Sequence, residues 1–280
     1  MEAFRSNFKT IQNKLFTLLL IGSIVYLGLT EGYIPPRSVS QEAWEKVTPY
    51  LLPEDHEAKA ALDAIFFSSR AILSIKSMKQ AGFIGPKPRK WTHVIVCTHP
   101  DLPGYIIKTY LDSQRYFNKI PEYEHWLKRI QGVKLIEQQI SKHNWESNFK
   151  TPKKWIYPLP ENPSPPKEFD RKNFILIEED MNLVDKQTNK DTWLSDLITT
   201  DLLENFYTLL EEVGLHDCAK PDNAPFSEDG RIAFIDTEDH DNWPVTYSKL
   251  TPFLSSEMKI YWKRLTEQTR RKDISLNIAY

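Results

Sequence analysis

One stretch, residues 214–239, constrains the fold of this chain more than any other: GLHDCAKPDNAPFSEDGRIAFIDTED. It follows DLLENFYTLLEEV, whose apolar residues recur at helical spacing. Gly214 stands where a glycine commonly ends a helix. The short apolar runs APF and RIAFID then flank the turn sequence SEDG, a pattern that is typical of a hairpin. The stretch therefore predicts a helix, a polar loop and a β-hairpin, in that order.

The rest of the chain predicts strands mainly in its first part and helices mainly in its second. HVIVCT and YIIKTY flank the turn-rich HPDLPG and predict a hairpin. KWIYPLP and NFILIEED predict two further strands, and residues 53–80 predict one or two helices that form an added layer. LTPFLSSEMKIYWKRLTEQTRR predicts a terminal helix. Residues 121–142 predict a helix whose apolar face consists of Trp126, Leu127, Ile130, Val133, Ile136 and Ile140.

The N-terminus carries a membrane signal. LFTLLLIGSIVYLGL, residues 15–29, has no charge, and Arg5, Lys9 and Lys14 precede it. As a helix it would span about 22 Å, slightly less than the apolar core of a bilayer. A signal-peptide core or a short anchor fits this run, and a buried helix is the alternative. The basic flank predicts a cytoplasmic N-terminus. We therefore expect a chain that is membrane-associated through residues 15–29, or one that is exported or secreted.

Composition excludes several classes of protein. Apolar residues make up 40% and charged residues 26%, as in an ordinary folded protein. The formal net charge of −2 implies no general attraction to nucleic acid, so we expect no nucleic-acid partner. The two cysteines, Cys97 and Cys218, are too few for a disulfide scaffold and lack the spacing of a zinc site.

The order of these elements, and residues 214–239 in particular, resemble the protein kinase-like superfamily. Its members carry H-R-D-x-K-P-x-N, a short hairpin, and an apolar strand that ends in an acid. IDTE at the end of RIAFIDTE resembles the I-D-x-E form of small-molecule kinases. The likeness covers about residues 80–265 and rests on short motifs. The residues that carry it are His216, Lys220, Pro221, Asn223, Asp236 and Glu238.

The resemblance implies an α+β, two-lobed, protein kinase-like fold. Residues 1–30 would be the signal or anchor and 31–79 a juxtamembrane and helical extension. Residues 80–180 would form the N-lobe and 181–280 a minimal C-lobe. The implied cofactors are ATP and Mg²⁺, and the implied reaction is phosphoryl transfer to a protein or small-molecule hydroxyl that the sequence does not identify.

The resemblance also assigns roles to individual residues. Mg²⁺ prefers oxygen ligands, and Asn223, Asp236 and Glu238 would supply them. Lys220 would neutralise charge on the transferred phosphoryl group. Asp217, beside His216, would orient the acceptor hydroxyl and accept its proton.

One departure from the family pattern concerns the base. In register with Asn223, the aspartate should stand at position 218, where the sequence has Cys218; Asp217 is one residue early. A thiol is a poor substitute for a carboxylate. Either a one-residue shift in the loop brings Asp217 to the base position, or the protein is an inactive pseudokinase that binds a nucleotide or a partner.

The nucleotide side of the site is assigned by the same resemblance. Lys108 in YIIKTY matches the strand lysine that binds the α and β phosphates, and Glu137 is the candidate helix carboxylate that holds it, with Glu124 as the alternative. The adenine-binding hinge would comprise Glu178, Glu179, Asp180 and Met181. AGFIGPKPRKW lacks the full glycine-rich pattern and favours an ordinary turn.

Two other interpretations of residues 214–239 are open. Asp, Asn, Pro and Gly are common turn formers, so the stretch is also compatible with a plain polar loop. His216 and Asp217 match the H-D pair of metal phosphohydrolases, but that fold is all-helical and RIAFID predicts a strand.

Overall fold

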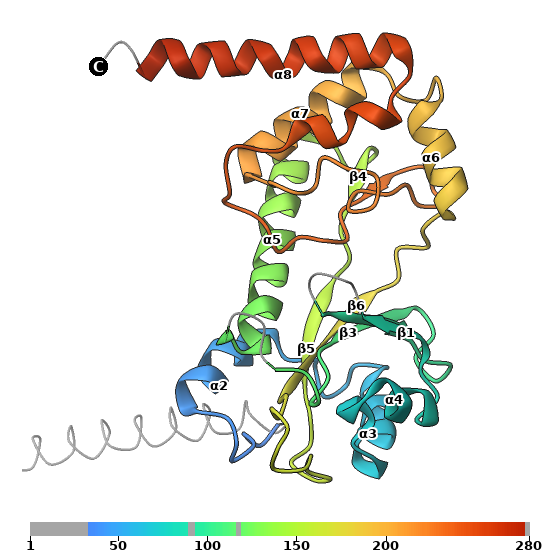
Figure 1. The fold of residues 1–280 in the computed structure, drawn as a ribbon, viewed down its shortest axis with the longest axis vertical. Coiled ribbons are helices and arrows are strands. Elements are labelled where there is room, and N and C mark those ends of the chain that lie inside the picture. The colour runs from blue at the N-terminus through green and yellow to red at the C-terminus, as the bar shows by residue number, and fades with distance from the viewer. Residues whose placement is uncertain (1–32, 89–92, 116–118, 278–280) are drawn as a thin grey trace, which may run out of the picture.

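The structure, a computed structural model, describes residues 33–88, 93–115 and 119–277. Figure 1 shows two lobes, one built on a sheet and the other mainly of helices, with helix α5 running from the first into the second. The predicted membrane segment, residues 15–29, lies outside the described residues. Within those three ranges, no helix has both the length and the apolar character that crossing a bilayer requires.

The sheet lobe contains five antiparallel strands in the order β1-β2-β3-β6-β5. The predicted hairpin and the two further strands are all present. β1 was not expected, because its prolines and glycine favoured a turn. It lies at the edge of the sheet, where a strand tolerates proline. The strands are β1 (Ile84–Pro88), β2 (Ile95–Thr98), β3 (Tyr105–Thr109), β5 (Lys154–Pro158) and β6 (Phe174–Glu179).

Helices cover both faces of this sheet. The added layer expected for residues 53–80 consists of α3 (Lys59–Ser68), a 3-10 turn (Ala71–Leu73) and α4 (Ile75–Gln80). It packs on the face that carries Ile107 and Ile177. The opposite face contacts α5 and α2 (Gln41–Val47), a helix that the sequence analysis missed. Ser40 begins α2 by accepting a hydrogen bond from the Ala43 backbone N–H, as N-cap serines do.

Helix α5 (Glu122–His143) belongs to both lobes. Trp126, Leu127 and Ile130, in its first half, pack with residues of the sheet. Ile136 and Ile140, in its second half, belong to the core of the other lobe. All these side chains are buried, as the helical pattern predicts. The helix therefore fixes the position of one lobe relative to the other.

The second lobe has an aromatic core that includes Trp193, Phe206, Phe234 and Trp262. The predicted helix before Gly214 is α7 (Thr200–Val213), and Gly214 has the left-handed φ of 64° that suits a helix-ending glycine. The predicted hairpin is short: Phe226 pairs with Ile232. The other elements are α6 (Lys186–Leu194), α8 (Ser256–Asn277), β4 (Phe149–Lys150), which pairs in parallel with β7 (Ile232–Ala233), and 3-10 turns at Thr48–Tyr50, Tyr247–Lys249 and Thr251–Phe253.

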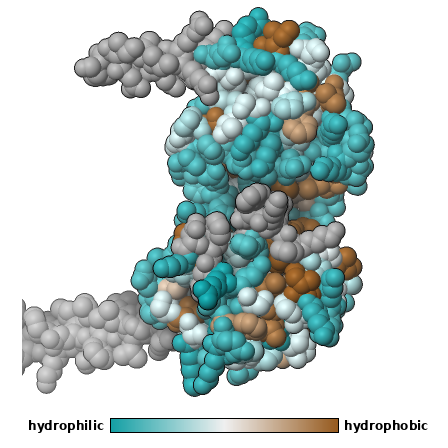
Figure 2. All heavy atoms as spheres, viewed as in Figure 1, coloured by the Kyte–Doolittle hydropathy of each residue, from teal (hydrophilic) through white to brown (hydrophobic). Residues whose placement is uncertain are grey.

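The surface agrees with a chain of ordinary composition. Hydrophilic side chains cover most of the face that Figure 2 shows, with apolar ones scattered among them. Helix α8 extends past the rest of its lobe (Figure 1). Both cysteines are free and buried, so neither takes part in a disulfide.

Candidate functional site

The segment that follows β7, residues 235–238, is where the two lobes meet. From the sheet, the Lys108 and Lys154 amino groups donate hydrogen bonds to the Ile235 carbonyl O, at 2.9 and 3.3 Å. From the polar loop, the Asn223 carbonyl O accepts from the Ile235 N–H at 3.2 Å. The Cys218 thiol donates to the Asp236 carbonyl O at 3.0 Å. Lys108 and Asn223, predicted from separate motifs, therefore contact one short segment, together with Lys154 and Cys218.

Asp217 faces the polar loop and not the protein interior. Its carboxylate forms ion pairs with Lys220 and Lys249, and the Asn223 amide donates to its backbone O at 2.9 Å and to its carboxylate at 3.2 Å. Its side chain is 32% exposed. Burial raises the pKa of Asp217, but hydrogen bonds from Lys220 and Lys249 outweigh this and lower it. A charged, partly exposed carboxylate thus lies beside Asn223.

Cys218 points the other way, into the core of the helical lobe. Burial raises the pKa of its thiol well above the ordinary value, so the thiol stays neutral. Because the adjacent side chains of Asp217 and Cys218 point in opposite directions, Asp217 lies beside Lys220 and Asn223. It does so although it stands one residue before the position that the kinase-like pattern gives to the aspartate. Cys218 contributes packing and one hydrogen bond.

His216 supports the same loop. One ring nitrogen, Nδ1, bonds to the Pro244 carbonyl O at 2.7 Å, and Nε2 bonds to the Thr246 hydroxyl at 3.2 Å. The His216 backbone N–H also donates to the Asp239 carbonyl O at 3.1 Å. Because both ring nitrogens are engaged, these contacts favour a role in joining the loop to residues 239–246.

The acids of the IDTE motif contact helix α5. Arg129 bonds to Asp236 and Glu238 through separate nitrogens, each at 2.5 Å, and His125 Nδ1 lies 2.6 Å from a Glu238 oxygen. Burial raises the pKa of Glu238, but the hydrogen bond from His125 and the charge of Arg129 lower it overall. The sequence analysis missed both His125 and Arg129. Both Glu238 oxygens are engaged, which favours a role in holding Arg129 over the predicted role as a metal ligand.

A glycine allows α5 to approach this segment closely. A Cβ at Gly132 would lie 1.9 Å from the Thr237 carbonyl O, far inside contact distance. The Thr237 hydroxyl in turn donates to the Arg129 carbonyl O at 2.6 Å. Backbone therefore packs on backbone here. A glycine in the middle of an amphipathic helix is the sequence signal that could have indicated this approach.

The predicted metal ligands fit Mg²⁺ only in part. Asn223 and Asp236 offer the amide and carboxylate oxygens that Mg²⁺ prefers, and they stand on adjoining segments. One Asp236 oxygen already bonds to Arg129. Within the described ranges, no group of three or more His, Cys, Asp or Glu side chains is arranged to hold a metal ion. A site built on Asn223 and Asp236 would therefore need ligand phosphates to complete it.

Lys108 has a different carboxylate partner from the one expected. Its amino group lies 2.8 Å from Glu178, whose other oxygen lies 3.2 Å from Lys154. Glu137 accepts instead from the Thr151 hydroxyl at 2.9 Å, and Glu124 lies 3.5 Å from Lys46. The partner of Lys108 therefore comes from the sheet and not from the helix.

The rest of the predicted hinge makes ordinary hydrogen bonds, each with at least one backbone group. A Glu179 carboxylate oxygen accepts from the Lys153 N–H at 3.1 Å, and the Asp180 N–H donates to the Gly104 carbonyl O at 2.8 Å. The Met181 carbonyl O accepts from Lys150 at 3.1 Å. These bonds tie the segment to β4, to the residue before β5 and to the loop before β3, and its binding of adenine stays a prediction.

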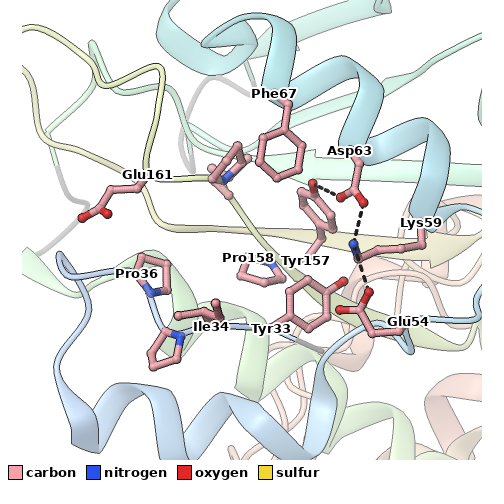
Figure 3. Close-up of a pocket in the computed structure, with 13 residues that line it drawn as sticks. Tyr33, Ile34, Pro36, Glu54, Lys59, Asp63, Phe67, Tyr157, Pro158 and Glu161 are labelled. Carbon is pink, nitrogen blue, oxygen red and sulfur yellow. Dashed lines mark hydrogen bonds and ion pairs between the residues drawn. The ribbon is translucent and has the colours of Figure 1, made fainter. Parts of the chain in front are cut away.

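A separate pocket of about 370 Å³ opens on the other face of the sheet (Figure 3). The chain near Tyr33, helix α3 and the end of β5 line it. Its polar side chains bind one another: Lys59 lies 2.6 Å from Asp63 and 3.3 Å from Glu54, and the Tyr157 hydroxyl donates to Asp63 at 2.8 Å. Tyr157 packs with the added helical layer, so this pocket is distinct from the converging groups around Asp236.

Comparison with known proteins gives no identification. No protein-family model matches this chain, and no curated protein matches it either. A functional interpretation must therefore rest on the contacts around residues 235–238.

Proposed function

We propose that this protein is a nucleotide-dependent phosphotransferase with a kinase-like, two-lobed fold, which transfers the terminal phosphoryl group of ATP to a hydroxyl group. One observation carries the proposal. Lys108 of the sheet and Asn223 of the polar loop both bond to Ile235, the residue before Asp236. The cationic side chain of Lys108 and two residues that carry possible metal-binding oxygens, Asn223 and Asp236, thus gather at the junction of the two lobes. Phosphoryl transfer requires such groups to position the phosphates.

Each group has a role in this proposal. Lys108 binds the phosphates of the nucleotide. Asn223 and Asp236 hold Mg²⁺, which when bound neutralises charge on those phosphates. Asp217 orients the acceptor hydroxyl and accepts its proton, and its low pKa keeps it ionised at neutral pH. Lys220 and Lys249 offset charge near the transferred group.

The position of the acceptor follows from exposure. Asp217 is partly exposed, whereas Lys108 and Glu178 are almost fully buried. The acceptor would therefore approach from the side of the polar loop. Membrane association through residues 15–29 is part of the same proposal and would bring the protein to a surface.

A non-catalytic nucleotide-binding module is the second candidate. Arg129 favours it, because this guanidinium already bonds to both Asp236 and Glu238. A metal ion on Asp236 would have to use the second carboxylate oxygen or displace Arg129 from the first. A protein that binds the nucleotide without turnover needs no change at Arg129.

Phosphotransfer from labelled ATP, measured together with ligand-induced shifts in melting temperature, tests the two candidates. Protein and small-molecule hydroxyl compounds serve as acceptors. We expect Asp217→Asn to lower the transfer rate by at least about 100-fold, because a general base contributes about that much or more. Asp222→Asn is the matched control, since Asp222 is an exposed neighbour in the same loop.

Three outcomes decide between the candidates. Transfer that Asp217→Asn abolishes and Asp222→Asn preserves supports the phosphotransferase. A shift with ATP but no transfer by the wild type supports the binding module. No shift and no transfer would refute both.

A further inference from the structure

Three buried charged groups lie side by side on one face of the sheet: Lys108, Glu178 and Lys154. Their side chains are 6%, 4% and 0% exposed. Each lysine is within ion-pair distance of a different oxygen of Glu178. Lys154 was not among the residues that the sequence analysis selected.

The register of the sheet explains the arrangement. Lys154 of β5 stands directly opposite Glu178 of β6. Lys108 of β3 stands opposite Leu176, two residues before Glu178 on the same strand. Side chains two residues apart project from the same face of a strand. All three groups therefore face α5 and residues 235–238.

The three groups carry a surplus of one positive charge. The two lysines also donate to the Ile235 carbonyl O, and Lys154 bonds to the Thr237 hydroxyl at 3.2 Å, but neither acceptor carries a charge. The nearest further acids, Asp236 and Glu238, share the single guanidinium of Arg129, so this neighbouring group of three carries a surplus of one negative charge. The two surpluses balance, but the positive one is held on the sheet and the negative one lies between α5 and residues 236–238. Phosphates of a ligand would therefore meet the positive charge at the lysines, and the proposed Mg²⁺ would meet the negative one at Asp236.

We propose that Lys154 is a positioning residue that neutralises Glu178 and so keeps the charge of Lys108 available for ligand phosphates. This inference rests on the proposed nucleotide binding and extends it. A lone Lys108–Glu178 pair would be neutral and would attract phosphate weakly. Because Lys154 occupies the second oxygen, Glu178 orients Lys108 without cancelling its charge. Lys154 itself is fully buried and does not touch the ligand.

A merely structural role for Lys154 predicts different behaviour. Loss of a structural lysine would lower stability and weaken every ligand to the same extent. Loss of a charge-balancing lysine leaves a matched Lys108–Glu178 pair. Affinity for phosphate-bearing ligands should then fall, while affinity for a ligand without phosphate holds.

Calorimetric titration with MgATP, MgADP and adenosine tests the inference. We expect Lys154→Met to lower the affinity for MgATP by about tenfold, which is the effect of one charge at short range in a partly polar interior. Adenosine, which has no phosphate, should bind as it does to the wild type. Lys153→Met is the matched control, because the Lys153 side chain is 72% exposed on the adjacent position.

A double variant makes the test specific. Lys154→Met with Glu178→Gln removes one charge of each sign and returns the surplus to Lys108. We expect its MgATP affinity to recover to within about threefold of the wild type. A purely structural lysine predicts that the double variant binds more weakly than either single variant.

The outcomes separate this inference from the proposed function. Wild-type affinity in Lys154→Met, or equal losses for MgATP and adenosine, would overturn the role of Lys154 and leave nucleotide binding intact. Absence of nucleotide binding by the wild type would overturn both.

Discussion

Each face of the sheet carries a cluster of three charged side chains, and the two clusters have opposite net charge. Between the lobes, Lys108 and Lys154 share one carboxylate, that of Glu178; in the pocket of Figure 3, Glu54 and Asp63 share one amino group, that of Lys59. The first cluster is at most 6% exposed. In the second, Glu54 is 41% and Asp63 32% exposed.

Exposure decides what each imbalance means. Water screens the extra carboxylate of the pocket, so that cluster needs no partner and costs the fold little. Water does not screen the extra lysine between the lobes, so its cost must be offset by neighbouring charges, among them that of Asp236, or by a ligand. The comparison therefore favours the buried cluster over the pocket as the candidate functional site.

The largest expected effect comes from removing the shared carboxylate of the buried cluster. Glu178→Ala leaves two buried lysines without a counter-ion, and we expect a loss of about 3–5 kcal/mol in the free energy of unfolding. Denaturant unfolding measures it. Glu179→Ala, at the next and more exposed position, is the control and should cost less than about 1 kcal/mol. Equal losses in the two variants would contradict the comparison.

The next effect is the dependence of stability on pH. Burial lowers the pKa of Lys154 to about 8, and Glu178 offsets this only in part. Between pH 8 and the ordinary value of 10.5, the unfolded chain therefore holds a proton that the folded chain has released. Stability contributed by this group is present above pH 10.5 and is lost as the pH falls through 8.

The wild type should thus gain up to about 3 kcal/mol relative to Lys154→Met between pH 7.5 and 10.5. Other groups titrate in this range, among them buried tyrosines, so the difference between the two proteins is the quantity to measure. Denaturant unfolding at fixed ionic strength gives that difference. A difference in stability that does not vary with pH would mean that burial does not lower the pKa of Lys154.

A smaller effect is expected at the pocket. Asp63→Asn weakens the ion pair with Lys59 and the hydrogen bond from Tyr157, and we expect a loss of about 1 kcal/mol. Asp55→Asn, at an exposed position in the preceding turn, is the control and should be nearly neutral. Thermal unfolding measures both. A loss as large as that of Glu178→Ala would remove the contrast between the two faces.

The smallest effect concerns Glu54. Glu54→Gln should change stability by less than about 0.5 kcal/mol, and raising the salt concentration should reduce even this difference, because the Glu54 side chain is 41% exposed. Unfolding at low and high ionic strength checks it. An effect of Glu54→Gln that salt does not alter would indicate that the pocket is as dry as the site between the lobes.

Local patterns predicted the elements that positioned the site. The hairpin around Lys108, helix α5 and the loop from Asp217 to Asn223 follow from periodicity and turn residues, which depend on neighbours along the chain. β1 and α2 were missed because tertiary contacts outweighed their weak local signals. The parallel pairing of β4 with β7 was missed for the same reason.

Contacts between side chains that are far apart in the sequence could not be predicted from the sequence. The choice of Glu178 over Glu137 depends on strand register, and the contacts of Arg129 with Asp236 depend on where α5 lies. Lys249, which contacts Asp217, comes from a turn with no recognisable motif. Among these contacts, only the close packing of α5 on residues 235–238 had a usable sequence signal, Gly132. A glycine within a helix often allows another part of the chain to pack closely against it.

The two buried thiols give each lobe its own reporter. Cys97 lies in the core of the sheet lobe and Cys218 in that of the helical lobe. A maleimide or disulfide reagent can modify each thiol only when its own lobe opens. The rates at which the two thiols are labelled, measured by peptide mass analysis, would therefore give the opening rate of each lobe in the wild-type protein. Equal rates would indicate that the two lobes open together, and different rates that they open independently.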